Sequence, residues 1–336
     1  MSRTEVLVEA RKHGLGCVFV KISKALEDQY MLQNNSESVY NLDQLVGAFC
    51  AYPYDNAEFG CDLGKFGAIE YIIELINKLE KLPSNDWIDD KIFWLLAILH
   101  HSIRHDGCAD NRPIFRRANA VDRLKKLIGS SNILLKVEVL LVLAYIVDEA
   151  ESKILGKDSN VISFIVEMLK KTVGDSDHQV FVTSGIYYSS TEILKALNHL
   201  IINDSNKKIV LENDGLPYLN RMLMSDFSTE EQTIAAKTLF SLAFEKSTRE
   251  VDAIKDTMEA LKSMLEAEDE ELRAVSRRTL WELDDSNDGE DDFDVEDDER
   301  KHAANKTGIP CLAKCRNKGK VVKKGGMMMM MVTVDT

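Results

Sequence analysis

The sequence predicts an all-α fold in which pairs of helices stack into a solenoid, and two recurring apolar patterns are the basis of this prediction. The first pattern places apolar residues at positions i, i+3, i+6 and i+7, which fall on one face of an α-helix. The second places two large apolar residues three positions apart and alternates with the first along the chain. Because each helix pair leaves an apolar face that it cannot bury alone, stacking the pairs creates a continuous core.

The first pattern predicts helices at residues 19–26, 69–76, 121–128, 162–169, 216–223 and 258–265. The second predicts a partner helix for each, at Val46/Phe49, Leu96/Leu99, Leu143/Ile146, Leu197/Leu200, Leu239/Leu242 and Leu280/Leu283. In the C-terminal half, the step from a second-pattern helix to the next first-pattern helix is constant. Extra residues are inserted around Pro83 and between 172 and 190, and both insertions are expected to form loops at one edge of the stack.

Residues 206–219, which read Asn-Lys-Lys-Ile-Val-Leu-Glu-Asn-Asp-Gly-Leu-Pro-Tyr-Leu, closely resemble the armadillo repeat. In that repeat a short first helix and a glycine turn precede an apolar second helix. Residues 59–75, with Gly67 at the turn, are similar to the same segment, and residues 118–121 are a looser version. The segment 233–243 resembles the third helix of the repeat.

The turn glycine allows the positive φ that a sharp bend between helices requires. It is missing at residues 159–160 and 256–257, where the sequence departs from the repeat. The resemblance spans about residues 15–283. It implies a right-handed superhelix of about six armadillo-type repeats over residues 1–283, followed by a separate low-complexity tail, 284–336.

The resemblance also implies a binding surface. In armadillo proteins the third helices line a concave groove for extended peptides, and importin-like members carry Trp and Asn at two groove-facing positions of each third helix. The Trp positions here hold Gln44, Trp94, Leu141, Lys195, Lys237 and Arg278. The Asn positions hold Ala48, Ile98, Tyr145, His199, Ser241 and Glu282. Only Trp94 matches, so recognition of nuclear-localisation peptides by a Trp/Asn ladder is disfavoured.

The two halves of the predicted groove differ in chemistry. We predict a partner-binding site made of Trp94, Ile98, Leu141, Tyr145, Lys195, His199, Lys237, Ser241 and Arg278, apolar in its N-terminal half. In its C-terminal half Lys195, Lys237 and Arg278 form a basic ladder, which suits an acidic or phosphorylated extended segment of a protein partner. The plainer interpretation, that these three cations are ordinary solvated side chains, stays open.

No catalytic, metal or cofactor site is predicted. His100, His101 and His105 lie near Asp106 and Asp110, but adjacent histidines on a helix point in different directions and no Cys/His spacing completes a metal site. No phosphate-binding glycine loop or nucleophile elbow is present. The six cysteines are scattered along a long chain, which favours reduced thiols in the cytosol or the nucleus.

Charge is unevenly distributed along the chain, whose net charge is −14. The acidic run 284–299 contributes −11 and the basic segment 300–336 contributes +8, so residues 1–283 carry −11. An acidic body disfavours generic nucleic-acid binding. No apolar run of about eighteen residues predicts a membrane span, and the N-terminus has no secretory signal.

The sequence therefore favours a non-enzymatic scaffold or adaptor that binds proteins through the groove. The alternative is the regulatory armadillo segment of a TIR-type signalling protein, because this array resembles those that precede TIR domains. The residues after 283 show none of the alternating strands and helices that a TIR domain needs. The acidic run is expected to be disordered, and folding back onto the basic ladder is one role for it.

Overall fold

The computed structural model describes residues 57–83, 85–183, 186–245, 248 and 253–284, with four isolated positions before residue 57. The chain divides into a first unit, Met1–Asp285, and a second unit, Ser286–Thr336, and all described residues belong to the first. Gln44, Ala48 and the tail beyond Asp284 lie outside the described residues. The tail's disorder and the domain boundary at 283 thus stay predictions.

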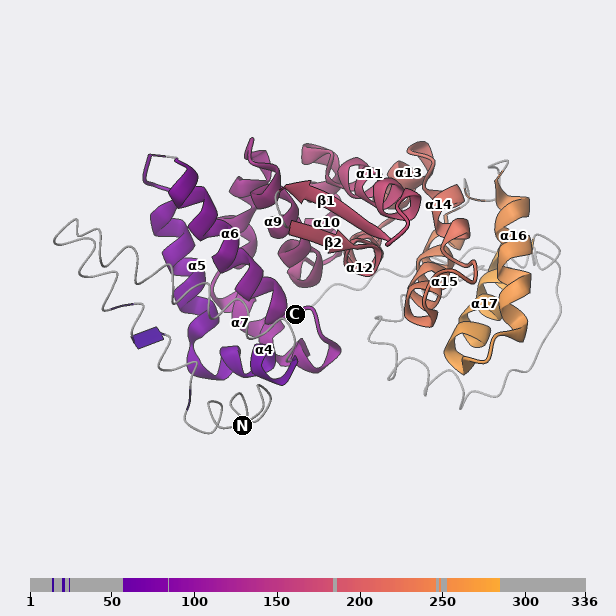
Figure 1. Ribbon diagram of the computed structural model, residues 1–336, viewed down its shortest axis with the longest axis horizontal. Helices are drawn as coiled ribbons and strands as arrows, with labels where there is room; N and C mark the ends of the chain where they lie inside the picture. Colours follow the sequence, from indigo (N-terminus) through magenta and orange to yellow (C-terminus); the bar gives the residue numbers. More distant parts are fainter. Residues whose placement is uncertain are drawn as a thin grey trace, which may run out of the picture. The chain divides into compact units, whose positions relative to one another are not determined.

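The described residues form a stack of helices with one β-hairpin (Figure 1). The first-pattern helices are α5 (Ala68–Leu79), α8 and η3 (Ala120–Leu124 and Lys125–Gly129), α11 (Val161–Gly174), α14 (Gly215–Arg221), and α16 and η5 (Ile254–Ser263 and Met264–Glu266). The second-pattern helices are α6 (Asp86–His101), α9 (Ile133–Ile146), α12 (Ser190–Leu200), α15 (Thr229–Ala243) and α17 (Glu270–Leu283). Shorter helices precede them: α4 and η1 (Ala57–Leu63 and Gly64–Phe66), η2 and α7 (Asp106–Asn111 and Arg112–Arg117), α10 (Glu149–Ser159) and α13 (Asp204–Glu212). The predicted all-α fold is confirmed, and the two helix types alternate through residues 57–284; the first predicted pair, at 19–26 and 46–49, lies outside the continuously described residues.

Four of the described units bend sharply into their first-pattern helix through one residue in the left-handed region, whereas Ala253, before α16, has a φ of −69°. Gly67 (φ 70°) precedes α5, Asn119 and Asn160 (both φ 51°) precede α8 and α11, and Asp214 (φ 53°) precedes α14. Asparagine and aspartate tolerate this conformation better than other non-glycine residues, which explains how the turn survives where glycine is missing. Gly215 has a different role from the one predicted, because a Cβ there would lie 2.5 Å from Cγ1 of Val210.

The core runs through the whole stack. In α11 and α14 all four apolar positions of the first pattern are buried, whereas Met258, Met264 and Leu265 of the last described unit are half-buried. The second-pattern helices correspond to the third helices of the armadillo repeat and are called third helices from here on. They pack in the order α6, α9, α12, α15 and α17, each against the next. Among the described residues this last unit has a neighbouring unit on one side only, which accounts for the lower burial of its apolar positions. Within the part of the chain that the structure describes, no helix is long and apolar enough to cross a membrane.

A buried asparagine connects successive units at the first helices. The Asn206 side chain is fully buried, and its Nδ2 donates to the carbonyl oxygens of Leu200 (2.7 Å) and Ser152 (3.1 Å). A Cβ on Gly156 would lie 2.0 Å from Oδ1 of Asn206, so only glycine leaves room for the asparagine. Asn111 repeats this arrangement two units earlier by donating to the carbonyls of Gly60 and Ser102.

The insertion between α11 and α12 was predicted as a loop, and the structure corrects this prediction. It forms an antiparallel hairpin of β1 (Gln179–Thr183) and β2 (Ile186–Ser189), in which Val180 pairs with Tyr188 and both are buried. Just before β1, the His178 ring stacks on Phe227, which precedes α15, with 3.9 Å between ring centroids. The hairpin also packs on α9 and α12, so it bridges three successive units.

Two cysteines contradict the prediction of scattered reduced thiols. The Sγ atoms of Cys61 in α4 and Cys108 in η2 are bonded in a disulfide that spans 47 residues of sequence. Cys108 is almost fully buried. The stack of α4 on η2 brings the two residues together, and no short-range Cys motif marks such a pair in the sequence.

Candidate functional site

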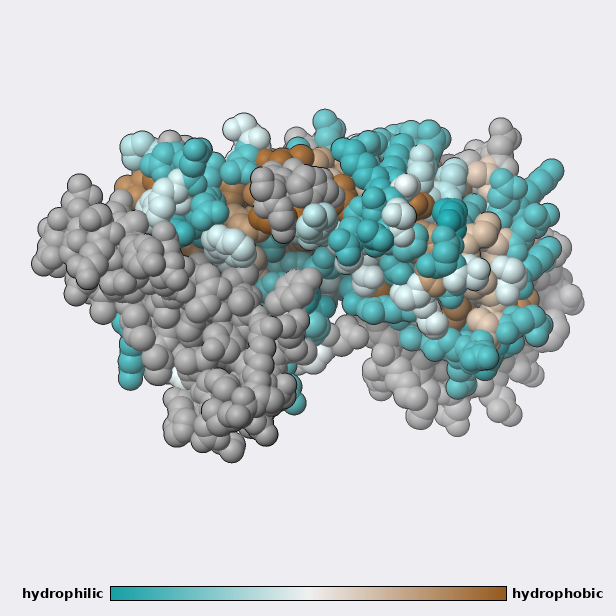
Figure 2. Space-filling model, in the orientation of Figure 1, coloured by the Kyte–Doolittle hydropathy of each residue, from teal (hydrophilic) through white to brown (hydrophobic). Residues whose placement is uncertain are grey.

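The candidate site is the third-helix face, the side of α6, α9, α12, α15 and α17 that carries the Trp and Asn positions. These helices follow one another through the stack in Figure 1, so their equivalent positions form two rows. Figure 2 shows that the described surface in the same orientation is mostly hydrophilic, with a few separate hydrophobic patches. The chemistry of the two rows decides what the face can bind.

The N-terminal half of the face is closed. Ile98 and Leu141, predicted to line an apolar groove, are 0% and 2% exposed and belong to the hydrophobic core. Tyr145 is 6% exposed, and its ring centroid lies 4.7 Å from that of His199. Trp94 is half-buried and packs edge-on against Phe93. Because buried side chains cannot touch a partner, Ile98 and Leu141 act as core residues in this structure.

A buried polar cluster lies beside this closed half, and sequence reasoning missed it. Glu138 of α9 is 3% exposed and accepts a hydrogen bond from the Tyr188 hydroxyl (2.8 Å). Nδ1 of His100 lies 3.3 Å from the same carboxylate. A carboxylate can be buried at low cost only when it is paired in this way. The sequence signal that could have revealed this cluster is Glu138 itself, a single acidic residue in the otherwise apolar run Val137–Ile146.

The histidine pair of α6, His100 and His101, is buried. Burial, and secondarily the neighbouring positive charges of His100, Arg104 and His105, lower the pKa of His101 to about 2. His101 is therefore neutral at physiological pH. Among the described residues no group of three or more His, Cys, Asp or Glu side chains is arranged to hold a metal ion.

The C-terminal half of the face is open and charged. Nζ of Lys195 lies 2.6 Å from Glu230, and Nζ of Lys237 lies 2.8 Å from Glu271. Arg278 is exposed and makes no ion pair with any residue that the structure describes. Glu271 and Arg278 are seven residues apart on α17, so they share one side of that helix. Because Lys237 reaches Glu271, it lies on the same side as Arg278.

The remaining two predicted contact residues lie beside these cations. Ser241 is half-buried, and its hydroxyl donates to the carbonyl oxygen of Lys237 (3.1 Å). His199 is half-buried between the closed and the open half of the face. The structure thus places Lys195, Lys237 and Arg278 on consecutive packed helices. The carboxylate partners of the two lysines were not predicted from the sequence.

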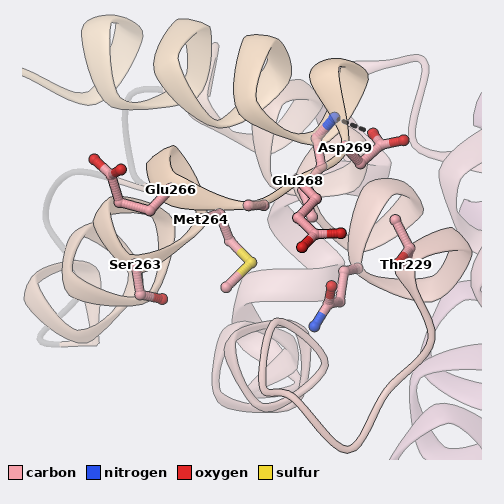
Figure 3. A pocket seen from close by; sticks show the side chains of 9 residues that line it. Thr229, Ser263, Met264, Glu266, Glu268 and Asp269 are labelled. Carbon is pink, nitrogen blue, oxygen red and sulfur yellow. Dashed lines mark hydrogen bonds between the residues drawn. The ribbon is translucent and has the colours of Figure 1, made fainter.

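A shallow depression lies near the start of α15 and α17, and its lining does not include Lys195, Lys237 or Arg278 (Figure 3). It is lined by Thr229, Gln232, Ser263, Met264, Glu266, Ala267, Glu268, Asp269 and Leu272. The Asp269 carboxylate is already engaged as the N-cap of α17, because it accepts a hydrogen bond from the Leu272 amide (2.7 Å). Three acidic residues and no basic one line this depression, so it does not suit an acidic ligand.

Comparison with known proteins gives the fold. No protein-family model matches the sequence, and no curated protein matches it. Solved structures do match. One, reported for a phosphorylation switch that controls the interaction between cadherin and beta-catenin, has a TM-score of 0.55 at 17% identity, over 78% of this chain and 44% of that one. A designed armadillo repeat protein matches with a TM-score of 0.52 at 14% identity, over 79% of this chain and 100% of that one.

The chain has an armadillo fold. An engineered protein with a TM-score of 0.50 and 18% identity, covering 78% of this chain and 96% of that one, is similar over the same length. The armadillo resemblance that the residues at 206–219 and 233–243 indicated is thereby confirmed at the level of the fold. Identities this low carry no information on which residues of the array bind a ligand.

Proposed function

We propose that this armadillo array is a non-enzymatic protein-interaction scaffold that binds an extended acidic or phosphorylated segment of a partner protein. The observation that carries the proposal is the basic ladder: Lys195, Lys237 and Arg278 occupy equivalent positions on three consecutive third helices. Helices in contact pack about 8–10 Å apart. An extended chain covers that distance in about three residues, so acids at every third position would meet the cations in turn.

Two further observations support a protein partner. The matching beta-catenin structure concerns an interaction with cadherin that a phosphorylation switch controls. Residues 1–283 carry a net charge of −11, which disfavours the long phosphate backbone of a nucleic acid and leaves a short acidic segment as the better fit. The contacts proposed for the partner are Lys195, Lys237 and Arg278, flanked by His199 and Ser241.

A charge-reversal experiment tests the proposal. The probe is a fluorescein-labelled peptide of about twelve residues with glutamate or phosphoserine at every third position, titrated into the full chain and followed by anisotropy. The variant K195E/K237E should weaken binding at least about tenfold. The control K171E/K262E reverses two exposed lysines on α11 and α16, away from the third-helix face, and should leave affinity within about twofold. Equal losses in both variants would show that net charge, and not the ladder, determines binding.

The cellular compartment is a separate proposal. We place the scaffold in the cytosol or the nucleus, and the Cys61–Cys108 disulfide is the feature that counts against this placement, because disulfides are rare there. Alkylation of free thiols in rapidly quenched cell lysate, followed by mass spectrometry, tests it. Free Cys61 and Cys108 support a reducing compartment, and protected ones contradict it.

A further inference from the structure

Two carboxylates match the basic ladder in register. Glu230 and Glu271 are each the second residue of their helix, following the N-caps Ser228 and Asp269. Each pairs with the lysine at the Trp position of the preceding third helix: Glu230 with Lys195, and Glu271 with Lys237. The same contact between neighbouring helices is therefore made twice.

The acid occurs only where the preceding helix offers a cation. The third helix that follows the one with Trp94 is α9, and its second residue is Leu134. The third helix that follows the one with Leu141 is α12, and its second residue is Thr191. Neither position is acidic, and the Trp positions of the two preceding third helices, Trp94 and Leu141, hold no cation. Among the described third helices, the acid at this position thus accompanies the ladder and is no general feature of the fold.

Stabilisation of the helix N-terminus does not explain these two residues. An acid in the first turn interacts favourably with the helix dipole. In α15 that position is already filled by Glu231, which forms the capping box with Ser228, and in α17 by Asp269 and Glu270. Glu230 and Glu271 are additional acids in turns that are already capped.

We infer that Glu230 and Glu271 are built-in competitors, which hold Lys195 and Lys237 until an acidic partner segment displaces them. This inference rests on the proposed function. Arg278 has no such competitor among the described residues, because no described third helix follows α17. Within the described ladder it is therefore the cation that an incoming segment does not have to release from a carboxylate.

The ion pairs are weak enough to be displaced. The side chains of Glu230 and Glu271 are 61% and 53% exposed, and exposed ion pairs contribute little to stability because water and salt screen them. A partner that supplies one carboxylate only exchanges one ion pair for another and gains little. A partner that supplies several acids, or phosphates, gains enough to open the ladder. The competitors thus set a minimum charge density for binding.

Removing the competitors tests the inference with the same acidic peptide probes. In E230Q/E271Q each substitution should raise affinity about two- to fivefold, and the pair about tenfold, because neither lysine has to be released and repulsion of the probe falls. The control E259Q/E270Q also removes two exposed carboxylates, which form no ion pair in the structure, and should change affinity less than about twofold. Arg278→Ala should cost more affinity than Lys195→Ala.

The outcomes separate this inference from the proposed function. An unchanged or weaker affinity of E230Q/E271Q, or an equal gain in the control, overturns the competitor role. If K195E/K237E weakens binding at least about tenfold in that case, the proposed function survives. If neither the unmodified chain nor E230Q/E271Q binds any probe, both proposals fall. A urea-unfolding midpoint close to that of the unmodified chain shows that the glutamine variants are folded.

Discussion

The packing of Gly156 against Asn206 allows the inter-unit core to be tested by a double-mutant cycle. An alanine Cβ at residue 156 would lie 2.0 Å from Oδ1 of Asn206, so Gly156→Ala must displace a fully buried side chain. That displacement breaks hydrogen bonds to Ser152 and Leu200, and each buried group left unsatisfied costs about 1–3 kcal/mol. The better helix propensity of alanine returns about 1 kcal/mol. We expect a net loss of about 2 kcal/mol in the free energy of unfolding.

In an Asn206→Ala background the obstruction is gone. Gly156→Ala should then be neutral or stabilising by up to about 1 kcal/mol, which gives a coupling energy of about 2–3 kcal/mol. Urea unfolding of the four proteins, followed by far-UV circular dichroism, measures the cycle. Additivity within about 0.5 kcal/mol would refute the reasoning, because it would mean that the two side chains do not compete for the same space.

Three further predictions concern the disulfide, the buried Tyr188 and the buried His101. Reducing the Cys61–Cys108 disulfide should lower the free energy of unfolding by at most about 4 kcal/mol, from a loop of 47 residues, and C61S/C108S should lose its response to reductant. Tyr188→Phe should lower the thermal midpoint through loss of about 1–2 kcal/mol, because Glu138 loses its hydrogen-bond donor. The pKa of His101 is about 2 in the folded chain and 6.5 in the unfolded chain, so the free energy of unfolding should fall as pH drops below about 6.5. In His101→Phe the urea-unfolding midpoint should depend less on pH between about pH 6 and 4.

The helices were predictable because their signal is local and periodic. The patterns at 162–169 and 216–223 predicted α11 and α14, and all eight of their apolar positions are buried. The turns were predictable only in part. Gly67 was identified, while Asn160 and Asp214 take the same left-handed conformation without a glycine. Repetition identifies an armadillo fold even when single turns depart from its consensus.

What the sequence could not predict depends on contacts between distant residues. The hairpin at 179–189 is short and follows a polar stretch, and its stability comes from packing on α9 and α12. Burial of Ile98 and Leu141 depends on what lies over the third helices, which the position of a residue in a repeat does not reveal. The partners of Lys195 and Lys237 lie in the following unit, 35 and 34 residues away, so no local pattern links them.

The most direct test of the central claim is lysine footprinting of the full chain with and without the phosphoserine peptide. Amine-reactive labelling read out by mass spectrometry reports each lysine separately, and Lys195 and Lys237 are both partly exposed. A partner segment on the basic ladder should slow labelling of these two lysines and leave the exposed Lys171 and Lys262 unchanged. Uniform protection of all four, or protection at Lys171 and Lys262 alone, would contradict a binding site on the C-terminal third helices.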